Sequence, residues 1–386
     1  MGEAQRLSPD EQLRVARDQF ETADDLTLAV EEEFALLDPR TLGLVNRFEE
    51  LFAAAHGTEL DGMLVGELIA SEVEIRTGRC DTFADAAARM GERRGQLLQL
   101  ADSLDLSLAA TGTHPWSAWQ EQRIIDTPHY RQNDEILRYV VWRNNSFGLH
   151  VHTGIRGADR AVRVATALRN YLPELLAVSA SSPFVENVFT HLHSARTQIF
   201  TKMFPRCGVP DPFAGWDEYE RYVRFLYETG SISEHTQIWW SVRPHLAFPT
   251  VEIRICDGQP QLAEAQALAA LLYSLTARIA VALDEGEPLP TFPRALLEEN
   301  FWRAIRYGIS GELIDLGAYP RARVRPARAA VEELVEWVLP VAEDLGAASY
   351  LGVPAVNAAQ RQIARLQAGA TLEEIYADEV LEAVRV

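Results

Sequence analysis

The chain has 386 residues, of which 47% are apolar, so it can bury a sizeable core in one large domain. Its formal net charge of −20 argues against a nucleic acid or an anionic membrane surface as a partner, because such binding draws on lysine and arginine. The three cysteines, Cys80, Cys207 and Cys256, have neither the spacing of a zinc site nor an even count, so we expect a reducing compartment.

The first residues carry charge throughout and contain no apolar segment that would indicate a signal peptide. We expect a loosely held polar leader over residues 1–25 and a single catalytic domain over residues 26–386. No apolar run reaches the length of a membrane span, and we expect a cytoplasmic protein.

The first expected strand covers residues 29–34, in which Glu31 and Glu33 share one face because side chains alternate along a strand. Their charges repel each other, so a chain that turns both inward needs a cation between them. Oxygen ligands suit Mg²⁺ or Mn²⁺ better than zinc. A solvated acidic edge strand is the alternative, and for one such strand alone it is the more common case.

A second acidic strand is expected around Glu72 and Glu74, which alternate with apolar residues, and Glu67 lies just upstream. This strand brings further carboxylates to one face of a sheet. Apolar residues at helical spacing then predict one or two helices over residues 81–104, and a strand is expected at 107–113.

The third polar strand contains His150 and His152, which share one face while apolar residues occupy the other. Histidine is the commonest nitrogen ligand of borderline metals. A helical pattern follows over residues 159–179, in which Pro173 predicts a kink or a break, and another helix is expected over 217–230.

The fourth polar strand, residues 250–257, places Glu252 and Arg254 side by side on one face. Beyond it the pattern is mainly helical, so we expect a helical C-terminal part over about 260–386. Carboxylate and guanidinium on one strand face are suited to a site that holds both a cation and an anion.

Each of these strands alone is more commonly a half-buried strand with a solvated polar face. Four strands that present carboxylate, imidazole or guanidinium on one face are better explained by a concave active site. Several cations beside an arginine favour a phosphate ligand, because this combination catalyses phosphoryl transfer. We therefore expect an α+β fold, in which a curved, mainly antiparallel sheet forms a concave metal and nucleotide site surrounded by helices.

Several motifs follow one another in an order that is typical of one enzyme family. They occupy residues 30–34, 73–78, 112–115, 148–154, 181–184, 238–244, 250–257 and 299–308. Through these motifs the chain resembles the bacterial carboxylate-amine ligases, the type 2 glutamate-cysteine ligase-like family, whose catalytic sheet is shared with glutamine synthetase. The resemblance runs from about Thr27 to about Leu316.

The resemblance implies roles for individual residues. The implied metal ligands are Glu31, Glu33, Glu67, Glu74, His150 and Glu252. Arg254 would stabilise the transferring phosphoryl group next to Glu252, and these two are the implied catalytic residues. The implied substrate or nucleotide contacts are Arg196, Arg243, Thr190, His152 and Arg306, although a surface role for Arg306 is equally compatible with the sequence.

The implied reaction is ATP-dependent amide formation. In such ligases the γ-carboxylate of glutamate, or of a similar acid, attacks the terminal phosphate of ATP, and an amine then displaces phosphate from the acyl phosphate. The implied ligands are ATP, Mg²⁺ or Mn²⁺ and small amino acids or amines, with a homodimer left open. A nucleotide- and metal-binding relative without ligase activity, or a phosphotransferase that uses the same metals, is the alternative.

The chain departs from the family pattern in places. In the segment 187–193, Phe189 and His191 stand where the family usually has an acidic residue and a glycine. His129 replaces a usual arginine, and His245 a usual serine. We expect the segment 187–193 to govern which substrate is accepted, with cysteine a poor acceptor.

Overall fold

The computed structural model describes residues 7–385 of the chain. Its central feature is a seven-stranded sheet with the strand order β10-β11-β5-β1-β3-β2, and β4 also pairs with β1. Every pairing in this sheet is antiparallel. The strands are β1 (Leu28–Leu37), β2 (Leu64–Val65), β3 (Glu72–Arg76), β4 (Ser107–Ala109), β5 (Gly148–Gly154), β10 (Val242–His245) and β11 (Thr250–Asp257). The α+β class expected from the sequence is confirmed.

The register of the strands aligns their polar residues across one face of the sheet. The paired residues are Glu31 with His150 and Arg76, Glu33 with Glu74, and Glu252 with His152 and Arg243. Because neighbouring residues of an antiparallel pair lie side by side on the same face, five strands contribute to one continuous polar surface.

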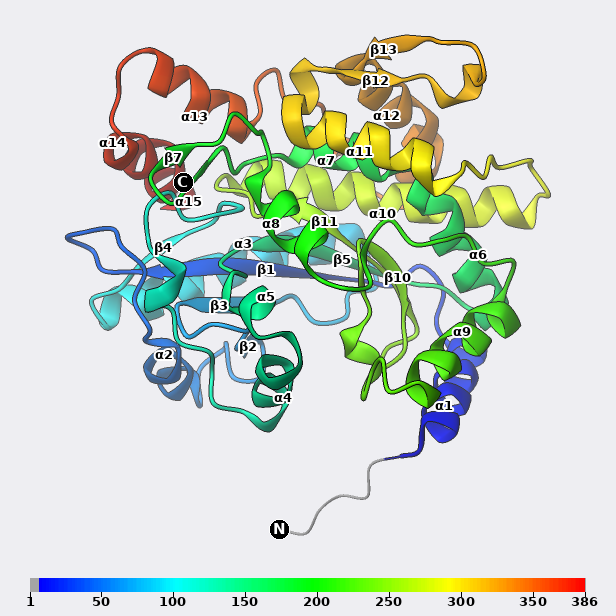
Figure 1. Ribbon diagram of the computed structural model, residues 1–386, viewed down its shortest axis with the longest axis horizontal. Helices are drawn as coiled ribbons and strands as arrows, with labels where there is room; N and C mark the ends of the chain where they lie inside the picture. The colour runs from blue at the N-terminus through cyan, green and yellow to red at the C-terminus, as the bar shows by residue number, and fades with distance from the viewer. Residues whose placement is uncertain (1–6, 386) are drawn as a thin grey trace.

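The opposite face of the sheet is apolar and is covered by helices. Val30, Val151 and Ile253 are almost fully buried there, in one core with residues of the covering helices. These helices are α3 (Phe83–Ser103), α6 (Ala158–Leu168), α7 (Leu172–Ser179) and α10 (Leu262–Asp284). Figure 1 shows α7 and α10 above the sheet, whereas α2 and α4 lie below it.

Glu32 is a charged residue on this apolar face, opposite in direction to its neighbours Glu31 and Glu33. It forms a buried ion pair with Arg94 of α3, whose Nε lies 3.1 Å from Glu32 Oε1. Arg94 also donates to the carbonyl oxygens of Gln259 and Pro260, each at 2.9 Å. The pair thus joins β1 to α3 and to the segment that leads into α10.

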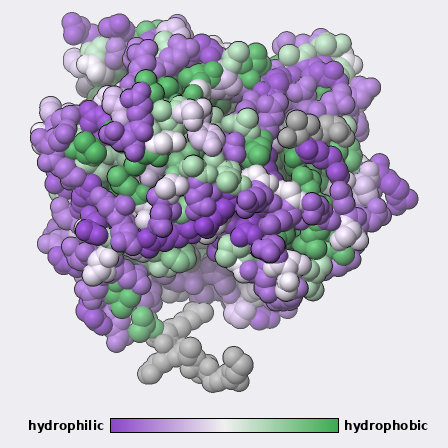
Figure 2. Space-filling model, turned by 180° about the vertical axis from the view of Figure 1, so that it is seen from behind, coloured by the Kyte–Doolittle hydropathy of each residue, from purple (hydrophilic) through white to green (hydrophobic). Residues whose placement is uncertain are grey.

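Among the helices of residues 7–385, α10 alone has the length and apolar composition that would allow it to cross a membrane. Its most apolar window is 72% buried inside the molecule, as in a core helix. The expectation that no run reaches such a length is therefore corrected. Figure 2 shows that hydrophilic residues predominate on the back of the molecule, in keeping with the high net charge.

The expected loose leader is wrong for its described part, because α1 (Pro9–Thr22) is a packed helix. Ser8 and Glu11 form a capping box at its start. Leu13 and Phe20 are buried in the main core, where the ring of Phe20 lies 5.9 Å from that of Trp216. Residues 1–6 of the leader lie outside the described residues.

The remaining elements surround the sheet, and most of those after β11 are helices. The helices are α2 (Phe48–Ala55), α4 (Pro128–Leu137), α5 (Tyr139–Trp142), α8 (Ala195–Met203), α9 (Trp216–Glu228), α11 (Arg294–Tyr307), α12 (Ala327–Asp344), α13 (Ala358–Gln367), α14 (Leu372–Tyr376) and α15 (Glu382–Arg385). Short strand pairs join β6 (Phe184–Val185) to β7 (Val188–Phe189), β8 (Cys207–Gly208) to β9 (Trp239–Trp240), and β12 (Glu312–Ile314) to β13 (Val324–Pro326). Pro173 lies in the first turn of α7, after a 3₁₀ turn that separates it from α6, so the predicted break is confirmed.

Candidate active site

A cavity of about 260 Å³ lies over the polar face of the sheet. The sheet supplies its floor through side chains of β1, β3, β5, β10 and β11. The walls come from α4, α5, α8, β9 and the turn between β10 and β11. The polar strand faces predicted from alternation therefore do converge on one cavity.

Three groups of side chains in this cavity could each hold a metal ion. They are Glu31 with Glu74 and His150, Glu31 with His152 and Glu252, and Glu33 with Glu67 and Glu74. Within each group the ligand atoms lie within 4.8 Å of one another. Because Glu31 and Glu74 each belong to two groups, neighbouring cations would share carboxylates. All six predicted metal ligands are brought together here.

The two histidines of β5 are held against these carboxylates. His150 Nδ1 lies 3.4 Å from Glu31 Oε2, and His150 Nε2 lies 3.6 Å from Glu33 Oε1. His150 Nε2 is buried and makes no hydrogen bond to any described residue. His152 Nδ1 is 2.9 Å from Thr250 Oγ1, which leaves its Nε2 facing Glu31 at 3.5 Å. Burial disfavours the imidazolium form, but Glu31 raises the pKa of His152 above its ordinary value.

The carboxylates crowd one another at the β3 side of the cavity. Burial, together with the charges of Glu33 and Glu31, raises the pKa of Glu67 to about 7. Burial and neighbouring carboxylates also raise the pKa of Glu72 and of Glu74 well above the ordinary value for glutamate. A buried set of like charges is stable when a cation neutralises it, so this cluster has the chemistry of a divalent metal site.

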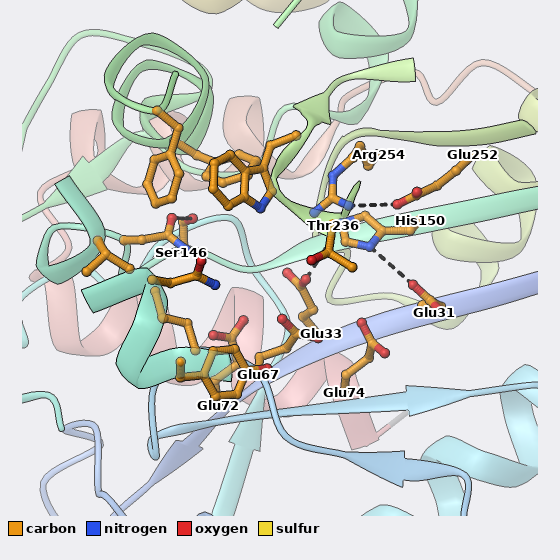
Figure 3. Close-up of a pocket in the computed structure, with 18 of the residues that line it drawn as sticks. Glu31, Glu33, Glu67, Glu72, Glu74, Ser146, His150, Thr236, Glu252 and Arg254 are labelled. Atoms are coloured by element: carbon orange, nitrogen blue, oxygen red, sulfur yellow. Dashed lines mark hydrogen bonds and ion pairs between the residues drawn. The ribbon is translucent and has the colours of Figure 1, made fainter. Parts of the chain in front are cut away.

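Glu252 is held between two arginines at the other side of the cavity. Its Oε2 lies 2.6 Å from Arg243 Nε, and its Oε1 lies 2.7 Å from Arg254 Nη1. Burial raises the pKa of Glu252, but the two guanidinium groups outweigh burial and bring it well below the ordinary value. Arg254 Nε is buried without a hydrogen-bond partner among residues 7–385, so this side chain has a donor left for an anion. Figure 3 shows Arg254 beside Glu252 and next to His150.

Arg196 also lines the cavity, but its guanidinium is nearly enclosed. It donates to the carbonyl oxygens of Ile255, at 3.2 Å, and of Arg254, at 3.5 Å. A Cβ atom on Gly148 would lie 2.2 Å from Arg196 Nη2, so Arg196 in its present position leaves no room for a side chain at residue 148. Arg196 therefore supports the strand that carries Arg254.

Thr190 and Arg306 are not brought into the cavity. Thr190 Oγ1 donates to the carbonyl oxygen of Pro183 at 2.9 Å, which closes its own loop. Arg306 donates to the carbonyl oxygen of His191. Both side chains stabilise the segment that was expected to govern substrate choice, and neither of them contributes to the lining of the cavity.

The segment 187–193 itself lies outside the cavity lining. It begins in the β6–β7 hairpin, where the ring of Phe189 lies 5.7 Å from that of Phe184. An ion pair between Glu186 and Arg143 connects the hairpin to the loop that follows α5. The segment can therefore influence the cavity through this loop, and the prediction that it governs substrate choice stays a prediction.

The other two departures from the family pattern do face the cavity. His129 Nδ1 lies 2.6 Å from Glu234 Oε1. The ring of His245 stacks on Phe248, with centroids 5.0 Å apart, and lies 5.3 Å from the ring of His152. These imidazoles place polar, partly aromatic surface at the edge of the cavity near β10.

Sequence reasoning missed several residues of the site. Arg76 Nε lies 2.6 Å from Glu74 and 3.2 Å from Glu31. Glu72, which was expected on the polar strand face but was given no role in the site, lines the same cavity. Alternation with Glu74 along β3 was a signal for both. The aromatic side chains of the wall had no such signal, since they come from α8, the residue that follows it and β9, far away in the sequence. They are Phe200, Phe204 and Trp239.

Comparisons with known proteins agree with this geometry. Residues 27–375 match the family model described as glutamate-cysteine ligase family 2. A protein of Solibacter usitatus named "Putative glutamate-cysteine ligase 2" is 39% identical over 321 residues, which cover 83% of this chain and 82% of that protein. One of Rubrobacter xylanophilus named "Putative glutamate-cysteine ligase 2-3" is 41% identical over 327 residues, which cover 85% of this chain and 87% of that protein.

Solved structures confirm the ligase-like fold. The glutamate-cysteine ligase of Francisella tularensis, in complex with AMP, superposes with a TM-score of 0.64 at 13% identity, covering 95% of this chain and 89% of that chain. A bifunctional glutathione synthetase of Pasteurella multocida gives a TM-score of 0.63 at 12% identity, covering 97% of this chain and 54% of that chain. At such low identity the likeness establishes the fold alone.

Proposed function

Because the chain belongs to glutamate-cysteine ligase family 2 and is therefore an ATP-dependent ligase, we propose that it joins an amine to the γ-carboxylate of glutamate, or of a glutamate-like acid, through an acyl phosphate. The observation that carries this proposal is the position of Glu252 and its two arginines beside three overlapping groups of metal-ligating atoms. Cations and a guanidinium around one space are what phosphoryl transfer from ATP requires.

The side chains present fit divalent cations such as Mg²⁺ or Mn²⁺. The proposed ligands are Glu31, Glu33, Glu67, Glu74, His150 and Glu252, with His152 beside them. The buried, unpartnered Nε2 of His150 and the mutual repulsion of the carboxylates both support a site that is completed by cations. When bound, these ions would neutralise the triphosphate and polarise its terminal phosphoryl group.

Arg254 is proposed to stabilise the charge that develops during phosphoryl transfer. Its Nη1 is fixed by Glu252, and its Nε remains free to donate to a phosphoryl oxygen. Arg243 holds the second oxygen of Glu252 and so keeps that carboxylate in place. A guanidinium whose direction is set before the substrate arrives does not need to reorganise during the reaction.

The acyl phosphate can be tested by trapping. Incubation with ATP, Mg²⁺, glutamate and hydroxylamine should release ADP and yield the γ-hydroxamate, because hydroxylamine reacts with an acyl phosphate. ADP release without any hydroxamate or amide, together with a stable phosphorylated product, would instead indicate a phosphotransferase. No ADP release with any acid would contradict the proposed function.

The metal site can be tested with Glu31→Gln, which removes a ligand shared by two groups without changing the side-chain shape. We expect turnover to fall by about 100-fold or more while the fold persists. Glu92→Gln, at an exposed position of α3, is the matched control. Unchanged turnover in a folded Glu31→Gln variant would show that this carboxylate cluster does not bind the catalytic metal.

A further inference from the structure

A second cavity, of about 450 Å³, lies behind the aromatic wall of the active site. Phe204 lines both cavities, whereas of the two neighbouring tryptophans in β9, Trp239 lines the first and Trp240 the second. This division follows from the alternation of side chains along a strand. The other lining residues come from α8, α9, α11, the segment 211–213 and residues 206–207. None of the residues proposed for catalysis or metal binding lines this second cavity.

Arg206 places a guanidinium in this second cavity without a carboxylate partner. Its Nε donates to the carbonyl oxygen of Gln237 at 3.0 Å, and the guanidinium lies over the ring of Trp239, 5.8 Å from the ring centroid. Nη1 and Nη2 make no hydrogen bond and no ion pair with any residue of the described chain. Burial lowers the pKa of Arg206, and no carboxylate opposes this shift. A partly buried cation in this state is expected to receive an anion from a ligand.

The other charged side chains of the second cavity have partners. Lys202 forms an ion pair with Glu298. Arg294 lies 3.6 Å from Glu298 and 3.9 Å from Asp211. Glu218 accepts a hydrogen bond from a main-chain N–H at 2.7 Å. Asp211 and Glu218 are also exposed, so solvent screens their charges, whereas the unpaired guanidinium is partly buried.

Aromatic rings form the apolar part of the second cavity. The ring of Tyr222 stacks on that of Trp240, with centroids 5.6 Å apart, and the ring of Phe213 lies 5.6 Å from Tyr222 and 5.7 Å from Trp240. Neither the hydroxyl of Tyr222 nor Nε1 of Trp240 makes a hydrogen bond within the described chain. Tyr222 and Arg206 are close enough to affect each other's pKa. The cavity thus combines free donors with flat apolar surface, as small-molecule sites do.

We propose that the second cavity binds a small monocarboxylate with an aromatic or other apolar body, and that this ligand acts as an effector of the active site. Arg206 donates to the carboxylate through Nη1 and Nη2, and the rings of Tyr222 and Trp240 contact the apolar body. A single unpaired guanidinium matches a single carboxylate. A dianion such as inorganic phosphate would bring a second charge near the acidic side chains of the cavity. Binding is independent of the proposed ligase function, whereas the effector role rests on it.

The effector role follows from the wall that the two cavities share. The guanidinium of Arg206 lies over Trp239, and the ring of Trp239 meets that of Phe204 edge-on, with centroids 5.4 Å apart. A carboxylate that binds Arg206 changes the contact of its guanidinium with Trp239, and packed rings transmit such a shift. Substrates in the first cavity then bind with a different affinity, because two ligands that bias the same element are coupled.

Calorimetric titration of the unmodified protein, without ATP, Mg²⁺ or glutamate, tests the binding. The probes are 3-phenylpropionate, phenethylamine, which has the same body with a cation in place of the carboxylate, and inorganic phosphate, which has no apolar body. We expect 3-phenylpropionate to bind about tenfold or more tightly than either of the other two. No binding of 3-phenylpropionate, or equal binding of phenethylamine or phosphate, would overturn the inference.

Variants locate the bound carboxylate. Arg206→Gln should weaken the binding of 3-phenylpropionate by about tenfold or more, and Tyr222→Phe, which keeps the ring, by about threefold. Arg221→Gln removes an exposed arginine of α9 next to Tyr222 and should change nothing, as should Arg254→Lys in the first cavity. If Arg254→Lys weakens binding while folded Arg206→Gln does not, the carboxylate binds in the first cavity and the inference is wrong.

The effector role is tested by ADP release with glutamate and hydroxylamine, with and without saturating 3-phenylpropionate. We expect kcat/KM to change by about threefold or more, and the change to disappear in Arg206→Gln. An unchanged kcat/KM at saturation, or an equal change in Arg206→Gln, would overturn the effector role. Absence of ADP release under all conditions would contradict the ligase function instead, and calorimetry would still report on the second cavity.

Discussion

Glu67 makes the stability of the metal-free protein depend on pH. Burial and the charges of Glu33 and Glu31 raise its pKa from the ordinary value of 4.5 to about 7. Below pH 4.5 the carboxyl is protonated in both the folded and the unfolded chain, so burying it does not lower the free energy of unfolding. As the pH rises further, the unfolded chain loses the proton first, and the free energy of unfolding falls until the pH exceeds 7.

Replacing Glu67 by glutamine should remove this dependence, because the amide keeps the shape of the side chain and cannot ionise. One pKa unit corresponds to about 1.4 kcal/mol, so the penalty above pH 7 approaches ~3 kcal/mol. We therefore expect Glu67→Gln to raise the free energy of unfolding of the metal-free protein by ~2–3 kcal/mol at pH 8 and by little at pH 5. With saturating Mg²⁺ the order should reverse, since the unmodified protein then gains a cation that the variant binds less well.

Urea unfolding between pH 5 and pH 8, with a chelator present, measures this effect. The difference between Glu67→Gln and the unmodified protein should grow steadily over that range. Glu92→Gln, at an exposed position of α3, should give a curve parallel to that of the unmodified protein. A Glu67→Gln variant whose stability also runs parallel at all pH values would refute the assignment of the raised pKa to this carboxyl.

Three further changes probe other parts of the structure. Arg254→Lys should lower kcat by about 100-fold with little change in the KM for ATP, because lysine lacks the planar fork of donors; steady-state kinetics that show only weaker ATP binding would contradict this. Arg94→Met leaves Glu32 buried without its partner and should lower the free energy of unfolding in urea by about 3–5 kcal/mol, most of which Glu32→Gln in the same chain should restore. A double variant as unstable as the single one would contradict the importance of the ion pair. Gly148→Ala places a methyl group 2.2 Å from Arg196 Nη2, so both stability and ADP release should fall, and normal values of both would show that Arg196 can move aside.

The alternation of side chains was sufficient to predict the floor of the site. Each of the four polar strands expected from the sequence exists, and the antiparallel register brings His150 and Glu74 next to the carboxylates of β1. The period of two residues is a direct consequence of strand geometry, so it can be read without knowing which strands pair. The pairing itself, which sets Glu252 against His152, could not be read from any one segment.

The remaining parts of the site depend on contacts between distant segments. The aromatic wall combines Phe204, which follows the last residue of α8, with Trp239 of β9. Their ring centroids lie 5.4 Å apart, and neither residue stands in a pattern that indicates a cavity. Thr190 and Arg306 were assigned through motif resemblance, which gives a place in the sequence but not the direction of a side chain. In α1 the signal was present, since Ser8 and Glu11 have capping-box spacing before buried residues at helical intervals.

The buried ion pair of Glu32 with Arg94 limits which insertions and deletions the sequence of β1 can tolerate. A strand with three successive glutamates could slip by one residue and still present a glutamate to each face, so charge alone does not define its frame. On the helical side of the sheet, Arg94 donates to the carboxylate of Glu32. The apolar side chains of Val30 and Phe34 point to the same side, so they favour the same register. A single inserted or deleted codon within this strand would turn two site carboxylates toward the helices. We therefore expect descendants of this chain to vary in the length of the turn at residues 38–43 but to keep the spacing within β1.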